Sequence, residues 1–157
     1  MKLTQYTDFS LRALIALAAA PYRRHTVSGI SSAYGISRNH LVKVVARLAE
    51  LGYVQTTRGN GGGVRLAQAP QEIRIGQVVR EMEAGLGVVD CLRRGSADCA
   101  IAPACQLKGL FAEATEAFLA ALDNHTLSEL VRPRAPIARL LGIPVTVEEE
   151  FIRVSAA

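Results

Sequence analysis

The sequence predicts a mainly α-helical protein with one small β-hairpin, arranged as a winged helix-turn-helix followed by a long dimerisation helix. Three observations lead to this prediction. Apolar residues recur at helical spacing in several segments of the 157-residue chain. A glycine turn separates a short helical segment from a longer one whose outer face is polar and basic. A Gly-rich hairpin pattern then follows directly, as expected for a wing.

The first three helices are predicted at residues 4–20, 27–34 and 38–50. In the first, Thr4 or Thr7 can cap the start and Pro21 ends the helix. Between the second and third, Gly35 can adopt a left-handed turn conformation and Ser37 is placed as an N-cap. The apolar stripe of the first helix is Leu11, Leu14, Ile15 and Ala18, and that of the third is Leu41, Val44, Val45 and Leu48.

Residues 53–67 predict the hairpin, with strands at 53–57 and 64–67 around a tip at 58–63. Arg58 at the tip and Arg65 on the return strand can reach phosphates or a minor groove. A phosphate-cradling nucleotide loop is the alternative, but the GxxxxGK[ST] pattern is absent. We therefore expect a DNA-facing surface made by Ser37, Arg38, Asn39, His40 and Lys43 in the major groove, with Arg58 and Gly59 at the wing.

The second half of the chain predicts a helix at about 75–84, a cysteine segment at 91–105 and a long helix from about 104 to about 123. The apolar stripe of the long helix is wide, which favours packing on another copy, an intrachain core being the alternative. These patterns divide the chain into a winged helix-turn-helix domain (1–70), a cluster-binding loop with the dimerisation helix (71–130) and a mobile C-terminal tail (131–157).

Charge is distributed unevenly along the chain. The net charge is +4, but residues 1–70 carry nine basic and two acidic side chains, and the remainder carries nine and twelve. The net charge of +7 on residues 1–70 suggests a module that binds a polyanion. The alternative is a basic surface that is merely solvated. Asp8 and Arg12 interrupt the N-terminal apolar run, and no stretch reaches the length of a membrane span. We expect a cytoplasmic protein without membrane contact.

All three cysteines, Cys91, Cys99 and Cys105, lie within fifteen residues. In a reducing compartment such a cluster favours a metal or redox site over disulfides, and soft sulfur ligands suit an iron–sulfur centre or zinc. Metal-free redox thiols and inert cysteines are the alternatives. Three cysteines leave a fourth ligand to be supplied by a carboxylate, a histidine or a small molecule. The sequence shows no Cys/His/Asp arrangement typical of a cysteine nucleophile, so we do not expect an enzyme.

Three features together carry a family resemblance: "MKLTQYTDFSLRALIALA", "SRNHLVKVVARLAELGYVQTTRGNGGGVRLA" and the late cysteines. Over roughly residues 1–130 the chain resembles the NsrR-type nitric-oxide-sensing repressors, which belong to the winged-helix family that also contains the iron–sulfur regulator IscR. The resemblance implies a homodimeric repressor on a pseudo-palindromic operator in double-stranded DNA. It further implies an iron–sulfur cluster whose attack by nitric oxide releases the promoter.

The resemblance also implies a ligand set. In some NsrR-like proteins three cysteines and an aspartate of the partner subunit hold a 4Fe–4S cluster, which we expect here rather than 2Fe–2S. Cys91, Cys99 and Cys105 match the cysteines, and Asp8 of the partner subunit matches the aspartate. Arg12 can orient that carboxylate or contact the cluster. The alternatives are a surface salt bridge for Arg12 and an ordinary helix-start aspartate, favoured by the helix dipole, for Asp8. Lys108 stands where the IscR pattern has histidine. The alternatives are a zinc- or thiol-based regulator without iron and an IscR-like regulator of iron–sulfur cluster genes.

Overall fold

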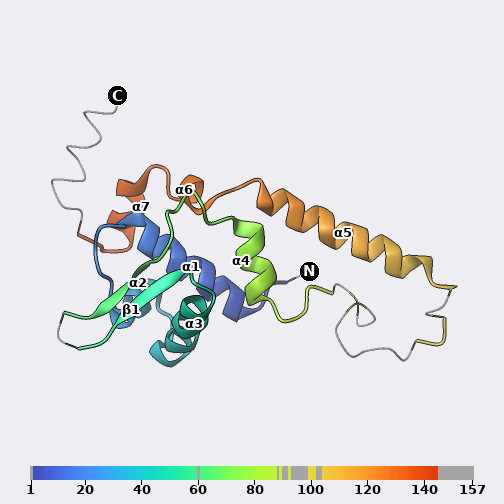
Figure 1. The fold of residues 1–157 in the computed structure, drawn as a ribbon, viewed down its shortest axis with the longest axis horizontal. Helices are drawn as coiled ribbons and strands as arrows, with labels where there is room; N and C mark the ends of the chain where they lie inside the picture. The colour runs from blue at the N-terminus through green and yellow to red at the C-terminus, as the bar shows by residue number, and fades with distance from the viewer. Residues whose placement is uncertain are drawn as a thin grey trace.

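The computed structural model describes residues 2–59, 61–87, 89, 92, 99–101 and 104–144. Over these residues the chain forms helices and one antiparallel hairpin, which confirms the predicted fold class (Figure 1). The elements in chain order are α1 Gln5–Ala19, α2 Val27–Tyr34, α3 Arg38–Glu50, β1 Val54–Thr57, β2 Gly63–Leu66, α4 Ile75–Met82, α5 Gln106–Asp123, α6 Leu127–Leu130 and α7 Arg134–Leu140.

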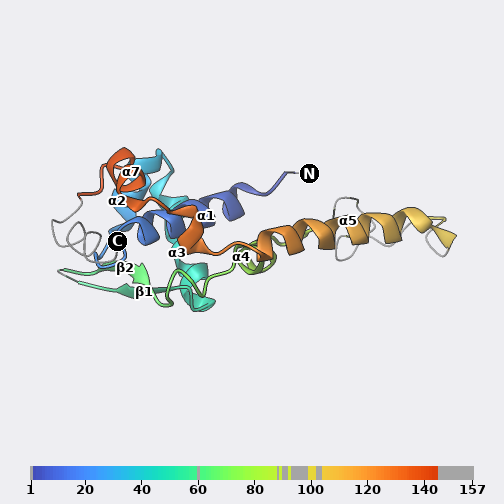
Figure 2. The same ribbon diagram turned by 90° about the horizontal axis from the view of Figure 1, so that it is seen from above.

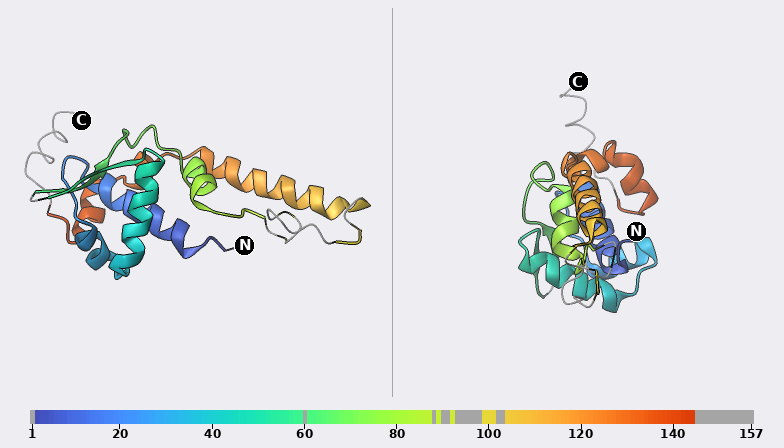
Figure 3. Two further views of the ribbon diagram at one scale, coloured as in Figure 1. Left: turned by 60° about the horizontal axis from the view of Figure 1, so that its bottom comes forward. Right: turned by 90° about the vertical axis from the view of Figure 1, so that its right-hand side faces the viewer.

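Helix α1 lies at the centre of the molecular body and contacts α2, α3, α4, α6, α7 and β2 (Figure 1). Its buried face is rich in alanine, and Ala13, Ala16 and Ala18 are completely buried. Such small side chains let neighbouring elements approach the helix closely. Of the two predicted caps, Thr4 fills the position and accepts a hydrogen bond from the Thr7 backbone N–H. The first turn of α1 points toward the side from which α5 projects (Figure 3).

Helices α2 and α3 begin and end at the predicted residues. Gly35 between them has a φ of 63°, the left-handed conformation that the turn requires, and its N–H bonds back to α2. The side chains of α3 buried in the core are the predicted stripe. One detail differs, because Ser37 occupies the N-cap position without making a side-chain cap bond.

The hairpin pairs β1 with β2 from Val54↔Leu66 to Thr57↔Gly63, within one residue of the predicted strand bounds. Val54 and Val64 are buried and anchor the base of the wing in the core. On its other edge β2 pairs with His25 through two backbone hydrogen bonds. A Cβ at Gly63 would lie 2.7 Å from the His25 carbonyl oxygen, so this close pairing requires glycine.

Helices α4 and α5 meet at a tight crossing, where a Cβ on Gly76 would lie 2.2 Å from an Asp123 carboxylate oxygen. Arg80 donates two hydrogen bonds to the same carboxylate, at 2.9 and 2.6 Å. Beyond this crossing α5 projects away from the body (Figures 1 and 2). It begins at Gln106, slightly after the predicted start, and α4 ends at Met82, before the predicted residue 84.

Most of α5 is exposed in the single chain. Its only buried residues are Thr115 and Leu119, while Leu107 and Leu110 of the predicted apolar stripe are 54% and 61% exposed. The described part of the chain therefore leaves these two leucines uncovered. Among the described residues, no helix is both long and apolar enough to span a membrane.

The C-terminal region differs from the prediction of a mobile tail from residue 131. Val131 and Ala138 are buried, and α7 packs on α1. The physical reason is that the prolines of the "RPRAP" run break the local helical pattern, while apolar side chains on either side of the run still pack into the core, among them Val131, Ile137 and Leu141. Residues 131–144 are therefore part of the body, and the remainder of the predicted tail lies outside the described residues.

Candidate nucleic-acid interface and candidate metal centre

The start of α3 presents a polar and solvent-exposed surface. Ile36 is buried and fixes the turn, while residues 37–40 and Lys43 are exposed. Ser31 Oγ donates a 2.6 Å hydrogen bond to the Ile36 carbonyl, which ties the turn to α2. The first N–H groups of a helix have no partner within the helix, and Ser37 leaves them without a side-chain cap. This helix end can therefore accept an anionic group such as a phosphate.

The predicted DNA-facing side chains of α3 differ in how they are held. Arg38 donates from Nε to Ser28 Oγ at 3.2 Å, which leaves its two terminal nitrogens for another acceptor. The His40 ring stacks on Phe9 of α1, with ring centroids 6.3 Å apart. Asn39 and Lys43 are exposed. Arg38 is thus positioned by α2 and His40 by α1.

Glycine shapes the tip of the wing. Gly59 and Gly61 have φ values of 94° and 75°, and a Cβ on Gly62 would lie 2.3 Å from the Thr57 carbonyl oxygen. Arg58 and Gly59, the predicted wing residues, are both exposed at this tip. Arg65 is also exposed and donates to the Gln55 side chain across the strand pair at 2.8 Å.

The base of the wing is fastened to α4. Tyr53 is 2% exposed, and its hydroxyl donates a 2.6 Å hydrogen bond to Glu81 on α4. Burial raises the pKa of Tyr53, and the hydrogen bond and negative charge of Glu81 raise this pKa further. The phenol therefore stays protonated and keeps donating, so this hydrogen bond ties the base of the wing to α4.

The predicted metal ligand Asp8 lies in the first turn of α1, beside its predicted partner Arg12. The Arg12 Nε lies 2.9 Å from an Asp8 carboxylate oxygen, and both side chains are a little under half exposed. Arg12 also lies over the Tyr34 ring, 5.8 Å from its centroid. The structure therefore brings Asp8 and Arg12 together and steadies the arginine on α2.

Two of the three cysteines fall within the described residues, and Cys91 lies outside them. Cys99 is exposed, and Cys105 is half-buried at the N-cap position of α5, both with free thiols. Within the described ranges, no three His, Cys, Asp or Glu side chains gather in a metal-binding group.

The contact between Glu83 and the start of α1 was not predicted from the sequence. Glu83, the residue after α4, accepts hydrogen bonds from the Thr4 N–H and hydroxyl, each at 3.0 Å, and another from the Thr7 hydroxyl. A helix start is often closed by an acidic residue three positions after its cap, but that position here is Thr7. Glu83 supplies the carboxylate from 79 residues away along the chain and so joins α1 to the loop that leads to the cysteines.

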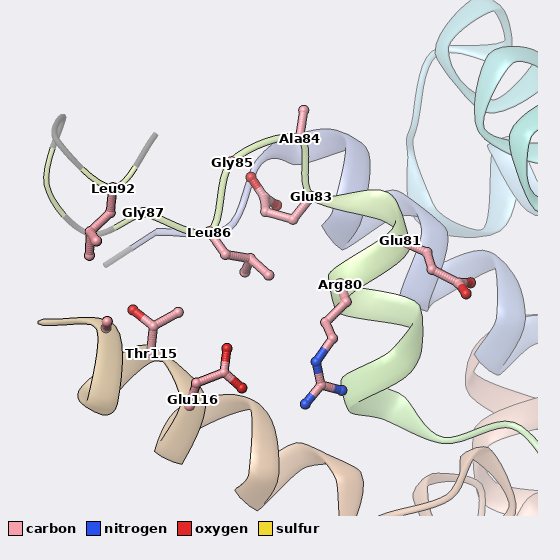
Figure 4. Close-up of a pocket in the computed structure, with 11 residues that line it drawn as sticks. Arg80, Glu81, Glu83, Ala84, Gly85, Leu86, Gly87, Leu92, Thr115 and Glu116 are labelled. Atoms are coloured by element: carbon pink, nitrogen blue, oxygen red, sulfur yellow. The ribbon is translucent and has the colours of Figure 1, made fainter. Parts of the chain in front are cut away.

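A cavity of about 470 Å³ lies between the end of α4 and α5. Figure 4 shows Arg80 and Glu116 extending into this space from opposite helices, with Leu86 and Leu92 nearer the cysteine segment. Arg80 is the only cation among the described lining residues, and its charge is already paired with Asp123, which accepts one hydrogen bond from each of its two terminal nitrogens. The cavity therefore offers no unengaged cation to a ligand.

Comparisons with known proteins agree with this geometry. A family model described as "Rrf2: Iron-dependent Transcriptional regulator" matches residues 3–133. The HTH-type transcriptional regulator NsrR of Bacillus subtilis is 49% identical over 142 residues, which make up 90% of this chain and 97% of that protein. CymR, the global cysteine regulator of B. subtilis, has a similar structure with a TM-score of 0.67 and 25% identity, over 84% of this chain and 97% of that chain. IscR of T. potens shares the fold, with a TM-score of 0.67 and 22% identity over 87% of this chain and 90% of that chain.

Proposed function

Because the chain belongs to the Rrf2 family of transcriptional regulators, we propose that it represses promoters as a homodimer and releases them when nitric oxide reacts with its iron–sulfur cluster. The observation that carries this proposal is the 49% identity to the regulator NsrR, which spans both the helix-turn-helix and the cysteine segment. The exposed, polar start of α3 supports it independently.

Each half of the dimer places one α3 and one wing on the DNA. Arg38 can pair with guanine through its terminal nitrogens, Asn39 can pair with adenine, and the uncapped start of α3 can hold a phosphate. Arg58 and Gly59 at the wing tip reach the backbone or the minor groove. Two such units address a pseudo-palindromic operator with half-sites about one DNA turn (~34 Å) apart.

The two copies associate through α5. Leu107 and Leu110 are more than half exposed, and they lie with Ala114 on one face of this helix. Burying an apolar stripe of this kind against its own copy gives a self-complementary interface, as twofold symmetry requires. The same association brings the first turn of α1 in one chain toward the cysteine segment of the other.

The cysteine segment and α1 hold the cluster. Cys91, Cys99 and Cys105 supply thiolates, and Asp8 of the partner subunit supplies an oxygen ligand, a set that suits a 4Fe–4S centre. Cys99 is exposed and Cys105 is half-buried at the start of α5, so both described thiols are free to bind a metal. When bound, the cluster supplies the irons that react with nitric oxide. Arg12 holds the Asp8 carboxylate in one orientation through their 2.9 Å contact.

Helix α1 connects this centre to α3 through side chains on either side of Asp8. The Tyr6 hydroxyl donates to the Lys43 carbonyl at 3.1 Å, and Phe9 stacks on His40. A shift of the first turns of α1 therefore displaces the α3 residues that face DNA. Cluster loss and operator release are linked by this contact.

The test begins with anaerobic purification of the full chain and measurement of iron, sulfide and zinc per chain. We expect brown protein with iron and sulfide, and Cys99→Ser protein that lacks both. Colourless protein containing zinc or no metal, even after attempted reconstitution, would overturn the cluster and favour a zinc- or thiol-based regulator. In gel shifts, equal promoter binding by holo, apo and nitric-oxide-treated protein would contradict cluster-controlled repression.

The DNA contact of the wing has its own test. Arg58→Ala should weaken promoter binding and reduce the slope of log affinity against log salt by about one per half-site. Arg139→Ala is the matched control, because Arg139 is exposed on α7 and is no part of the proposed interface. An unchanged slope for Arg58→Ala would remove Arg58 from the phosphate contacts.

A further inference from the structure

Val42 is an unusual residue for the surface on which it lies. Its side chain is 43% exposed. Among the described residues of α1, α2, α3 and the hairpin, it is the only large apolar side chain so exposed. Toward the start of α3 its neighbours on the same face are Arg38 and Asn39, both polar, and toward the end it is followed by the small Ala46. The buried stripe of the helix lies on another face. Val42 therefore contributes little to the core of the protein.

The position of Val42 follows from helix geometry. It comes four residues after Arg38 and three after Asn39, so the three side chains share one face of α3. This face lies in the first half of the helix, which is the part of a recognition helix that contacts base edges. Lys43, the next residue, is exposed beside it.

Elementary energetics do not favour valine here in the free protein. A β-branched residue is a poorer helix former than alanine or lysine, and exposed apolar surface is unfavourable in water. The other DNA-facing residues of α3 offer hydrogen bonds or charge. An apolar side chain among them is complementary to one feature of the major groove, the C5 methyl group of thymine.

We propose that Val42 reads the C5 methyl group of a thymine in each operator half-site. This inference rests on the proposed DNA contact of α3 and adds to it a residue that determines specificity. Arg38 and Asn39 recognise bases through hydrogen bonds, whereas Val42 packs its methyl groups on the thymine methyl and so distinguishes thymine from cytosine. No hydrogen bond is needed, and none of the polar residues of α3 can replace this contact.

The experiment uses the full chain, isolated anaerobically, and a duplex recovered by selection from a randomised pool. Thymines are replaced by deoxyuridine, one symmetric pair at a time, which removes only the methyl group. At one pair we expect affinity to fall about fourfold per half-site and about fifteenfold for both. Val42→Ala should bind the thymine and deoxyuridine duplexes equally, and both more weakly than the wild-type chain binds thymine.

Two further variants test whether the preference for thymine comes from the methyl groups of Val42. Val42→Thr keeps one of the two methyl groups, so it should retain part of the preference for thymine. Arg58→Ala should weaken binding to both duplexes and leave the thymine-to-deoxyuridine ratio unchanged, because a phosphate contact does not depend on the base. Circular dichroism of each variant confirms that the helices are intact.

The outcomes separate the inference from the function on which it rests. If selection recovers no duplex, the proposed operator binding itself fails. If a duplex is bound but no thymine methyl affects affinity, the assignment of Val42 is wrong. It is also wrong if Val42→Ala discriminates against deoxyuridine as strongly as the wild-type chain does. Substitution in the DNA alone tests the wild-type protein, so the inference does not depend on how the variants fold.

Discussion

The body around α1 and the projecting helix α5 differ in the exposure of their apolar side chains. In the body, Leu14, Leu41 and Leu48 are completely buried by other parts of the same chain. On α5, Leu107 and Leu110 are more than half exposed. Both regions have amphipathic helical sequences, so the difference lies in what the chain places against each. The body buries its apolar side chains within the chain, whereas the exposed leucines of α5 are the surface that a second copy covers in the homodimer we propose.

Truncating one leucine in each region gives the largest expected effect. Leu41→Ala creates a cavity in the core and should lower the free energy of unfolding by about 2–5 kcal/mol. Leu110→Ala should leave the unfolding of the monomer nearly unchanged and should weaken self-association instead. Urea unfolding over a range of protein concentrations and sedimentation equilibrium measure the two effects. If Leu110→Ala destabilises the monomer as much as Leu41→Ala does, α5 is covered within its own chain.

Substituting alanine for one glycine at the α4–α5 crossing and for one on the exposed part of α5 should give the next largest effects on stability. Gly76→Ala places a Cβ against Asp123 and the Leu119 carbonyl, so it should cost about 1–3 kcal/mol of stability by forcing α5 away from α4. Gly109→Ala has open space around it, and it should stabilise α5 by about 0.5–1 kcal/mol. Thermal unfolding of both variants provides the measurement. A destabilising Gly109→Ala would mean that another chain packs on that side of α5.

Tyr53→Phe tests the link between the wing and α4. Loss of the hydrogen bond to Glu81 should lower stability by about 1 kcal/mol at neutral pH. The folded-state pKa of Tyr53 is raised, so its contribution is fully present below the unfolded value of about 10 and is lost as pH rises above it. Tyr53→Phe should therefore flatten the alkaline part of the stability curve. A wild-type curve that is already flat there would contradict the buried, protonated phenol.

Asp123→Asn should give the smallest effect, because the Arg80–Asp123 pair is about one-third exposed and is screened by solvent. The hydrogen bonds from Arg80 hold the pKa of Asp123 below its ordinary value. Its contribution is therefore present above the unfolded value of about 3.9 and is lost as pH falls further, through the folded pKa. Wild type should lose slightly more stability than Asp123→Asn during acid titration followed by circular dichroism. Equal losses would show that the pair does not steady the junction between α4 and α5.

The parts of the fold that the sequence predicts well depend on short-range patterns. The bounds of α2 and α3 follow from an apolar stripe and from Gly35, all within 24 consecutive residues. Helix α7 depends on long-range packing, in which Ala138 and its neighbours fit against the alanines of α1. Alanine gives little periodic signal, and the two prolines of the "RPRAP" run suggest a break, so the sequence indicated a tail.

In the candidate site, too, contacts between residues close in the sequence can be predicted, and contacts between distant residues cannot. Asp8 and Arg12 are one helical turn apart, so their ion pair could be expected from spacing alone. The contact between Glu83 and Thr4 joins residues far apart in the chain, and no local sequence pattern predicts it. Tyr53 and Glu81 are a similar case, since neither belongs to a recognised motif. The cluster ligands are still predictions, and Cys91 lies outside the described residues.

The projection of α5 has a mechanical consequence. A rigid rod of its 18 residues is about 27 Å long, because an α-helix rises about 1.5 Å per residue. Its root is stiffened by the Gly76 crossing and the doubly bonded Arg80. In a pair of chains joined along this rod, a tilt of only about 5° at the root moves the far end by about 2 Å. In the homodimer that we propose, the long arm therefore acts as a lever, because a small change of angle at the root becomes a larger displacement at the start of α5, beside Cys105.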